Sequence, residues 1–180
     1  MAFGVLVQPE IVSQGPIHLL VLRQRLSPFI YEQGIRVGLV YRNLLNQDHV
    51  HFFSQRPHNP ASVIKLAIMV AVYRKILTGE LQFSDTVVMN STHKQFGSGV
   101  LRYRPSGTRL SIRDLIDYMM IQSDNTATRI LSEKLGLAYI NQSVQSLGLM
   151  NTNMGTHNLF QADGLNVTTA ADMALLMSRL

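Results

Sequence analysis

The chain has 180 residues, 46% of them hydrophobic, and a formal net charge of +5. A chain of this length and composition can bury a core, and it fits one domain or two subdomains that share a core. Its basic residues are scattered along the sequence instead of clustering, so no nucleic-acid-binding surface is predicted. The absence of cysteine excludes a disulfide framework and thiolate metal ligands.

Residues 1–17 are treated as an amino-terminal extension of uncertain role. They lack a basic region followed by an unbroken apolar run, so they do not match a clear signal peptide. No segment reaches the roughly 18 uninterrupted apolar residues of a membrane-spanning helix. We therefore expect no membrane span.

Residues 18–55 are expected to hold the first helix and two strands of a sheet subdomain. Residues 18–33 fit either a helix or a strand, and Ser27-Pro28 has the pattern of a helix cap followed by a first helical position. The segments 35–43 and 49–55 are rich in β-branched and aromatic residues and flank a turn-like stretch, which predicts two antiparallel strands.

Residues 56–180 are expected to form a helical subdomain. Residues 62–78 are apolar on nearly all faces and stop at Gly79, a pattern that predicts a central buried helix. Strands followed by a group of helices indicate an α+β fold.

Amphipathic helices follow this central helix. Ser111 and Asp114 form a capping-box pattern at the start of one of them, and Thr169 is the expected cap of the last. Helical spacing of apolar residues predicts helices within 111–122, 123–136, 138–149 and 168–180.

The central helix carries a lysine near its start. Ser62 and Lys65 are three residues apart, so they lie on the same helix face. A lysine desolvated by Val63, Ile64 and Leu66 loses its preference for the charged form, and a neutral amine can accept a serine proton. Ser62 is then a candidate acyl-forming nucleophile, with helix N–H groups nearby that favour an oxyanion. A serine cap followed by a lysine that extends to solvent is the ordinary alternative.

A second motif, SDN, occupies Ser123, Asp124 and Asn125 at a predicted break between helices. Polar side chains at such a break can point into a cleft, or can simply end one helix and cap the next. Each motif alone can arise by chance in a chain of this composition, but the two motifs in this order arise by chance much more rarely.

The pair SVIK and SDN resembles the penicillin-recognising serine hydrolases, and the class A β-lactamases most closely. The segments GSGVLRY, LSIRDLIDYMMIQSDNTATRIL and LGLMNTN are similar to the helical domain of those enzymes, so the resemblance covers about residues 30–180. It implies a β-lactamase/transpeptidase-like α+β fold, in which a helical subdomain joins an antiparallel sheet. It implies no cofactor and no metal.

By resemblance, Ser62 is the nucleophile and Lys65 its activator. Ser123 relays a proton to the leaving nitrogen, Asn125 holds the side-chain amide of the substrate, and Asp124 braces the loop. The implied protein is a β-lactamase-like acyl-serine hydrolase that acts on a β-lactam, and it lies outside the cytoplasm. A penicillin-binding D-alanyl-D-alanine peptidase acting on cell-wall peptide, or a non-catalytic acylatable sensor of the same fold, are the alternatives.

One departure concerns the third motif of the family, K-T-G or K-S-G on a strand. It is absent from the 180 residues. The fold is therefore expected to be truncated before the later strands. That leaves an exposed sheet edge through which the chain can oligomerise.

A second departure concerns deacylation, which class A enzymes assign to the glutamate of E-x-x-L-N. The chain has Leu165 and Asn166 but places Ala162 where the glutamate stands. Asp163 is a candidate replacement, although it is one methylene shorter and displaced by one residue. The alternative is that Asp163-Gly164 only forms a turn.

The remaining polar and aromatic residues carry less information. The six histidines lack the spacing of a metal site, and His49 and His51 merely share a strand face. Tyr103 is expected either to line the cleft near the SDN loop or to pack as an ordinary aromatic.

Overall fold

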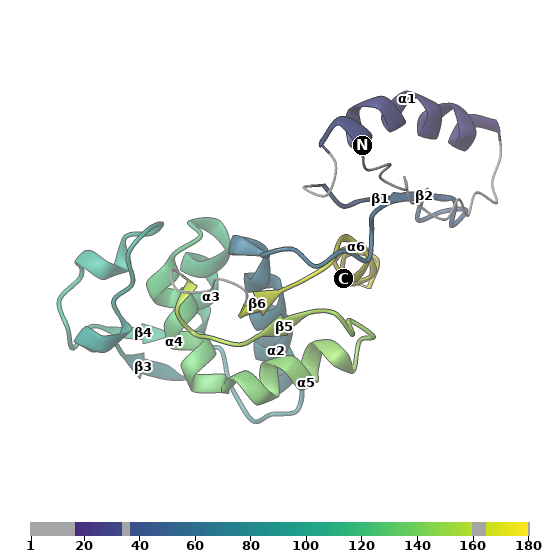
Figure 1. The fold of residues 1–180 in the computed structure, drawn as a ribbon. Helices are drawn as coiled ribbons and strands as arrows, with labels where there is room; N and C mark the ends of the chain where they lie inside the picture. The colour runs from purple at the N-terminus through teal and green to yellow at the C-terminus, as the bar shows by residue number, and fades with distance from the viewer. Residues whose placement is uncertain (1–16, 34–36, 160–164, 180) are drawn as a thin grey trace. The chain divides into compact units, whose positions relative to one another are not determined.

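The computed structural model describes residues 17–33, 37–159 and 165–179 (Figure 1). The chain divides into two compact units, Met1–Arg56 with Thr169–Leu180, and Pro57–Thr168. The sequence analysis assigned residues 169–180 to the helical subdomain, but they group with residues 1–56 in the structure. No helix within the described ranges is both long and apolar enough to cross a bilayer.

The described residues of the first unit form two helices and a hairpin. Its elements are α1 (Ile17–Gln33), β1 (Leu39–Arg42), β2 (His49–Phe52) and α6 (Ala170–Met177). The predicted antiparallel pair is confirmed with shorter strands, in a register that places Leu39 opposite Phe52 and Arg42 opposite His49. Its buried core consists of Leu19, Ile30, Val50 and Phe52.

The α1 helix removes the ambiguity of residues 18–33. It continues through Ser27 and Pro28, so the interpretation of these two residues as a helix start was wrong. The Ser27 hydroxyl donates a hydrogen bond to the Arg23 carbonyl at 2.8 Å, within the helix. Pro28 lacks the N–H that a helix interior normally uses, so α1 has one backbone hydrogen bond fewer at this position.

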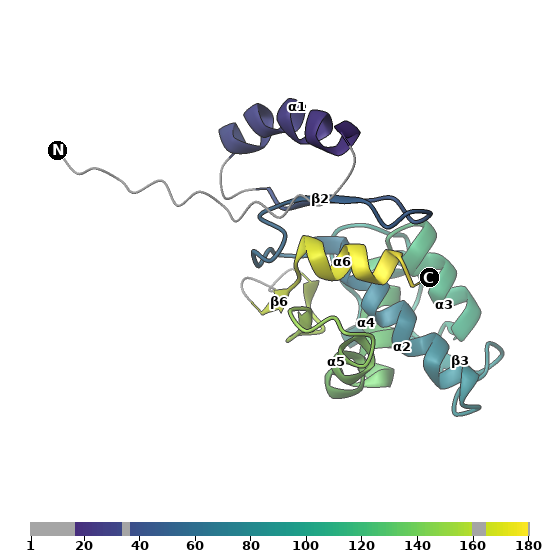
Figure 2. The same cartoon turned by 90° about the vertical axis from the view of Figure 1, so that its right-hand side faces the viewer.

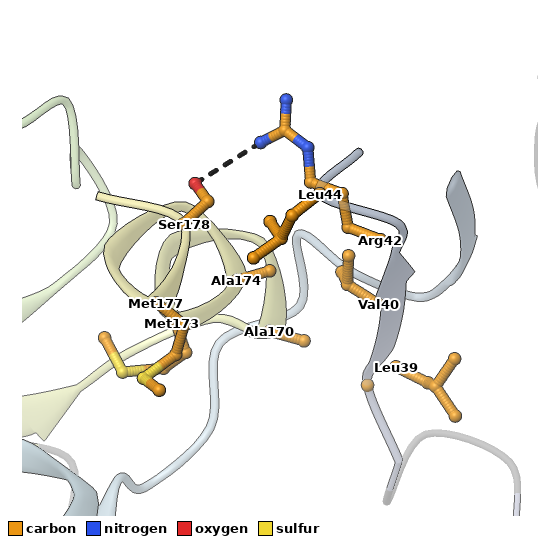
Figure 3. A pocket seen from close by; sticks show the side chains of 10 residues that line it. Leu39, Val40, Arg42, Leu44, Ala170, Met173, Ala174, Met177 and Ser178 are labelled. Carbon is orange, nitrogen blue, oxygen red and sulfur yellow. Dashed lines mark hydrogen bonds between the residues drawn. The ribbon is translucent and has the colours of Figure 1, made fainter. Parts of the chain in front are cut away.

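An apolar groove of about 500 Å³ runs between β1 and α6 (Figure 3). Figure 3 shows the side chains of Val40 and Met173 along it, and the Arg42 guanidinium donating a 3.4 Å hydrogen bond to Ser178 Oγ. Among the described strands, β1 pairs only with β2. Oligomerisation through the other edge of β1 stays a prediction.

The second unit is built around α2 (Lys65–Leu77), which follows the 3₁₀ turn η2 (Ala61–Ile64). Figures 1 and 2 show α2 among the other helices of this unit, and it contacts each of them: α3 (Ile112–Ile121), α4 (Asn125–Leu135) and α5 (Leu137–Gln145). The predicted central buried helix is therefore confirmed. It ends before Gly79, whose φ of +77° lies in the left-handed region.

Both predicted caps are present. The Ser111 hydroxyl accepts a hydrogen bond from the Asp114 amide at 3.0 Å, and Asp114 Oδ2 accepts one from the Ser111 amide at 3.0 Å. The Ser111 hydroxyl also donates to Asp114 Oδ2 at 2.6 Å, and this bond, followed by the one from the Ser111 amide, lowers the pKa of Asp114. At the start of α6, the Thr169 hydroxyl accepts from the Asp172 amide at 3.1 Å.

Two short ladders of the second unit were not predicted: β3 (Thr86–Val88) with β4 (Arg109–Ser111), and β5 (Asn153–Met154) with β6 (Asn166–Val167). The first ladder is extended by a 2.9 Å bond from the Met89 amide to the Thr108 carbonyl. It closes the base of a long loop, residues 90–107, which contains the 3₁₀ turns η3 (Ser91–His93) and η4 (Leu101–Tyr103).

Candidate active site

Ser62 lies in the η2 turn immediately before α2, and not inside the α-helix itself. The preceding Ala61 has a φ of +45°, and its amide donates to Asn59 Oδ1 at 3.0 Å. Ser62 is exposed, so its hydroxyl is accessible to a small molecule. Val63, expected to help desolvate the lysine, is itself 45% exposed.

Lys65, in contrast, is 2% exposed and surrounded by oxygen atoms. Its Nζ lies 3.2 Å from Ser62 Oγ and 2.8 Å from Ser123 Oγ. It also lies 2.6 Å from the Ser123 carbonyl oxygen and 2.9 Å from Asn125 Oδ1. The two serine hydroxyls are 3.0 Å apart, so they form a triangle with the amine.

The four oxygens around the amine are not equivalent. The Ser123 carbonyl and Asn125 Oδ1 can only accept hydrogen bonds, whereas the hydroxyls can donate or accept. An ammonium has three protons for four oxygens. A neutral amine gives its two N–H bonds to the two obligate acceptors and turns its lone pair toward the hydroxyls. The neutral form therefore fits this environment as a proton acceptor.

Electrostatics moves Lys65 toward that neutral form. Burial lowers the pKa of Lys65 from 10.5 to about 8, and the Asp124 carboxylate opposes this by raising the pKa. At pH 7 roughly a tenth of the amine is then neutral, against less than about a thousandth for an exposed lysine.

The SDN motif is held in a tight turn between α3 and α4. Ser123 has a φ of +54°, a conformation that non-glycine residues adopt infrequently and that clusters at functional sites. Asp124 is 1% exposed and caps α4 by accepting the Ala127 amide at 2.9 Å. Its second oxygen accepts the Leu101 amide at 2.8 Å, which ties the turn to the loop 90–107.

Asn125 joins the lysine to the same loop. Its Oδ1 accepts from Lys65, and its Nδ2 donates to the Phe96 carbonyl at 2.9 Å. The Asn125 backbone amide donates to the Ser98 carbonyl at 3.0 Å. Nδ2 keeps a second N–H and Oδ1 a second lone pair for a substrate amide.

Two supporting residues escaped the sequence reasoning. Gly99 has a φ of +99°, and a Cβ built there would lie 2.1 Å from Asp124 Oδ2, so the close approach of loop and turn requires glycine. Thr126 Oγ1 accepts the Gln95 amide at 3.0 Å. The Gly-Ser-Gly run at 97–99 was the available signal for the first, whereas nothing local marked the second.

The segment near the expected deacylation residue is only partly described. Ala162 and Asp163 lie outside the described residues. Asn166 is 1% exposed, and its Oδ1 accepts the Gly155 amide at 2.9 Å. Asn166 therefore braces the β5–β6 region, and Leu165 beside it is 51% exposed.

The histidines within the described ranges lie beside other side chains. His93 faces Glu133 at 3.5 Å, and His157 Nδ1 lies 2.9 Å from Ser132 Oγ. His49 and His51 stack with ring centroids 5.8 Å apart. Nowhere in the described part of the chain do three His, Asp or Glu side chains converge.

Residues 21–180 match the beta-lactamase enzyme family (Beta-lactamase2). The chain belongs to the beta-lactamase enzyme family. The resemblance inferred from SVIK and SDN is thereby confirmed, as is the β-lactamase/transpeptidase-like α+β fold.

Individual proteins are similar to the chain in sequence and in structure. A beta-lactamase of Bacteroides uniformis is 27% identical over 139 residues, which make up 72% of the chain and 45% of the relative. The structure of PBP-A is 26% identical with a TM-score of 0.83, over 93% of the chain and 63% of PBP-A. A mutant of PBP-A was solved as an acyl-enzyme complex with penicillin G.

A third relative is the D-alanyl-D-alanine carboxypeptidase DacD of Francisella tularensis, 27% identical with a TM-score of 0.69. The match covers 79% of the chain and 36% of DacD. The chain thus spans less than two thirds of the length of each of these three relatives.

Proposed function

We propose that the chain carries the catalytic serine of a β-lactamase-like acyl-serine hydrolase that opens a β-lactam amide. The observation that carries this proposal is the triangle of Ser62 Oγ, Lys65 Nζ and Ser123 Oγ, with edges of 3.2, 2.8 and 3.0 Å. An accessible hydroxyl next to a neutral amine is the arrangement that activates a serine nucleophile.

The proposed acylation begins when the neutral Lys65 amine takes the Ser62 hydroxyl proton. The Ser62 oxygen forms a bond to the lactam carbonyl carbon, and the carbonyl electron pair moves to oxygen. When the carbonyl re-forms, the C–N bond breaks and the nitrogen takes a proton from the Ser123 hydroxyl. The Lys65 ammonium then returns a proton to Ser123. The product is a Ser62 ester, and the protons balance.

Asn125 is proposed to bind the amide of the substrate side chain. Its amide is buried, fixed at one end by Lys65 and at the other by the Phe96 carbonyl. Because it is fixed in this way, a substrate amide meets a donor and an acceptor already oriented. Asp124 is proposed to brace the turn through the Leu101 and Ala127 amides and not to contact substrate.

A D-alanyl-D-alanine peptidase is the second candidate function. The same triangle serves attack on a peptide carbonyl, and the similarity to DacD and PBP-A favours this reading. The sequence also has Ala162 where class A β-lactamases carry the deacylating glutamate. A protein that acylates and releases slowly behaves as a penicillin-binding peptidase or as a sensor. In each case an extracytoplasmic location is proposed, because these substrates lie outside the cytoplasm.

The proposal is tested by mapping a covalent adduct. The 180-residue chain is incubated with penicillin G, and its peptides are analysed by mass spectrometry. We expect the adduct on Ser62, its loss in Ser62→Ala and its retention in Ser106→Ala, an exposed serine away from the triangle. An adduct on another serine with Ser62 unmodified overturns the assignment.

A steady-state assay then separates the candidate functions. Repeated turnover of penicillin favours the β-lactamase, whereas a persistent adduct with release of D-alanine from a cell-wall peptide favours the peptidase.

A further inference from the structure

A basic pocket lies in the first unit, where the hairpin meets α6. It has a volume of about 330 Å³, and small-molecule sites typically measure about 300–1,000 Å³. The residues of its lining that matter for recognition are Val40, Arg42, His49, His51, Ala174 and Leu175. We name these six residues the basic pocket. Figure 3 shows three of them, Val40, Arg42 and Ala174, which also line the neighbouring apolar groove.

The register of the hairpin brings three basic side chains to this pocket. Side chains alternate along a strand, so His49 and His51 share one face of β2, and Arg42 lies directly opposite His49. The two imidazole rings are stacked, with centroids 5.8 Å apart and planes 13° from parallel. Arg42 and His49 are exposed, so a ligand in solution can reach them.

The positive charge of the basic pocket has no acidic partner. No carboxylate lines the cavity, and the ion pairs among the described residues include neither Arg42 nor either histidine. Arg42 makes one long hydrogen bond, of 3.4 Å, to the Ser178 hydroxyl. Its remaining guanidinium donors are therefore available to a ligand.

The surroundings of His51 are positive on each element that packs near it. Burial lowers the pKa of His51, and His49 on β2 and Arg23 on α1 lower it further. Asp48, beside the histidines in sequence, faces His18 at 3.4 Å. Asp172, the acidic residue of α6, is buried and does not line the cavity. An anion in the basic pocket would supply the missing negative charge.

We propose that the basic pocket binds a small phosphomonoester, with the phosphate on Arg42, His49 and His51 and the organic group against the apolar wall of Val40, Ala174 and Leu175. A guanidinium meets two phosphate oxygens with paired N–H donors, and the imidazoles offer donors to the third. A phosphomonoester carries about −1.5 to −2 charges at pH 7. It therefore balances this cluster better than a carboxylate with one charge.

The proposal is independent of the acylation proposed for Ser62. The triangle of Ser62, Lys65 and Ser123 belongs to the second unit, whereas every residue of the basic pocket belongs to the first. Binding is therefore measured without any reaction at Ser62, and its failure leaves the proposed function standing.

The first experiment follows binding by NMR. Phenyl phosphate, phenol and inorganic phosphate are titrated at constant ionic strength into the isotope-labelled 180-residue chain, and backbone amide shifts are recorded. We expect saturable shifts at residues 40–42, 49–55 and 171–175 with phenyl phosphate, at least tenfold weaker binding of phenol and severalfold weaker binding of inorganic phosphate. Equal binding of phenol, or shifts centred elsewhere, overturns the proposal. Equal binding of inorganic phosphate overturns the assignment of an ester.

Variants show whether the basic side chains are responsible. Arg42→Gln should weaken phenyl phosphate binding at least tenfold, and Arg25→Gln, which removes the same charge from an exposed position of α1, should retain it. If Arg42→Gln is poorly folded, Arg42→Lys keeps the charge but not the paired donors and should still weaken binding. A similar loss in Arg25→Gln means a general charge effect and overturns the proposal.

The second experiment uses the proton affinity of His51 as a signature of the bound anion. A dianion beside an imidazole favours its charged form, so saturating phenyl phosphate should raise the pKa of His51, measured from its ring C–H shifts. His157, in the second unit, is the control and should titrate at the same pH with and without the ligand. An unchanged His51, or an equal change in His157, overturns the proposal.

Discussion

The Nζ atom of Lys65 lies 2.6 Å from the carbonyl oxygen of Ser123 and 2.8 Å from the hydroxyl of the same residue. Both oxygens reach the amine while Ser123 holds its left-handed backbone, with φ at +54°. Lys65 is therefore positioned by the backbone of the SDN turn as well as by side chains. Changes that distort the turn should impair the lysine even when no atom of the triangle is removed.

The pH dependence of acylation tests the role of Lys65. Because the active form is the neutral amine and its pKa is about 8, the acylation rate constant should rise about tenfold per pH unit below 8 and level off above it. Lys65→Arg cannot offer a neutral amine and should acylate about 10² to 10⁴-fold more slowly. At each pH, reactions of the chain with penicillin are quenched at set times. The acylated fraction is measured by intact-mass spectrometry and gives the rate constant.

Lys75→Arg in the last turn of α2 is the matched control. Lys75 pairs with Glu80 at the surface and should tolerate the exchange. A Lys65→Arg variant that is folded and acylates at the parental rate would falsify the general-base role.

The same pKa shift predicts how stability depends on pH. In the unfolded chain Lys65 titrates near 10.5, and in the folded chain near 8. Between these values the unfolded state binds more protons, so the free energy of unfolding rises with pH across this window. Below about pH 8 the lysine is protonated in both states and its contribution no longer changes.

Chemical denaturation of the parent and of Lys65→Met, from pH 7 to pH 10.5, isolates this contribution. The difference in unfolding free energy, parent minus variant, should increase with pH over the window. A difference that stays flat shows that Lys65 is not desolvated in the folded protein.

Asp124→Asn should lower the stability of the fold and should also lower the pKa of Lys65. An amide nitrogen facing either the Leu101 or the Ala127 N–H leaves one buried donor unpaired, at a cost of about 1–3 kcal/mol. Loss of the negative charge also removes the influence that raises the pKa of Lys65. The midpoint of the acylation pH profile should therefore move below 8.

Asp117→Asn, at an exposed position of α3, is the control for both readouts. If Asp124→Asn shifts the pH midpoint upward, the charge of Asp124 does not act on Lys65 as described.

Gly99 and Gly107 form a matched pair for the contact between loop and turn. Both have positive φ, +99° and +93°, but an added Cβ clashes with Asp124 only at Gly99 and meets nothing within 4 Å at Gly107. Both alanine variants should lose about 1 kcal/mol or more from backbone strain. Gly99→Ala should lose a further 1–3 kcal/mol or so by displacing Asp124.

Thermal or denaturant unfolding of both variants gives the comparison, and acylation gives a second readout. Only Gly99→Ala should acylate slowly. Equal destabilisation of the two variants would mean that the loop moves aside without cost.

Local patterns were sufficient to predict several helix starts. The capping box at Ser111 and Asp114 and the cap at Thr169 depend on residues within one helical turn, and each formed as predicted. The central helix was predictable because its apolar residues cover most faces. The proximity of Ser62 to Ser123 could be predicted only from the family resemblance, because the two residues lie far apart in the chain.

Other features depend on contacts that no local pattern encodes. The left-handed Ser123 is stabilised by the Lys65 amine and by the Asp124 bonds to the loop, so its own sequence neighbourhood gives no sign of it. Val63 is 45% exposed and lies in the 3₁₀ turn η2, where the sequence predicted the start of the α-helix. Ser27 and Pro28 have the pattern of a helix start, but Leu19 before them and Ile30 after them belong to the same buried core, which their own pattern does not encode.

The last prediction concerns release of the acyl group from Ser62. Hydrolysis of the ester needs a base that activates water, and such a base typically contributes about 10² to 10⁴-fold in rate. The sequence offers Ala162 at the position where class A β-lactamases have glutamate. We therefore expect the penicillin adduct of the parent chain to persist after free penicillin is removed, with negligible steady-state turnover.

Ala162→Glu should shorten the adduct lifetime by about 10² to 10⁴-fold, as followed by intact mass over time. Ala162→Gln has nearly the same size but no basic carboxylate, so its adduct should last as long as that of the parent. Equal acceleration by both variants would mean that the larger side chain acts through its size and not by activating water. If the parent chain itself turns over penicillin rapidly, Asp163→Asn decides whether Asp163 is the base, because loss of turnover in that variant assigns the role to its carboxylate.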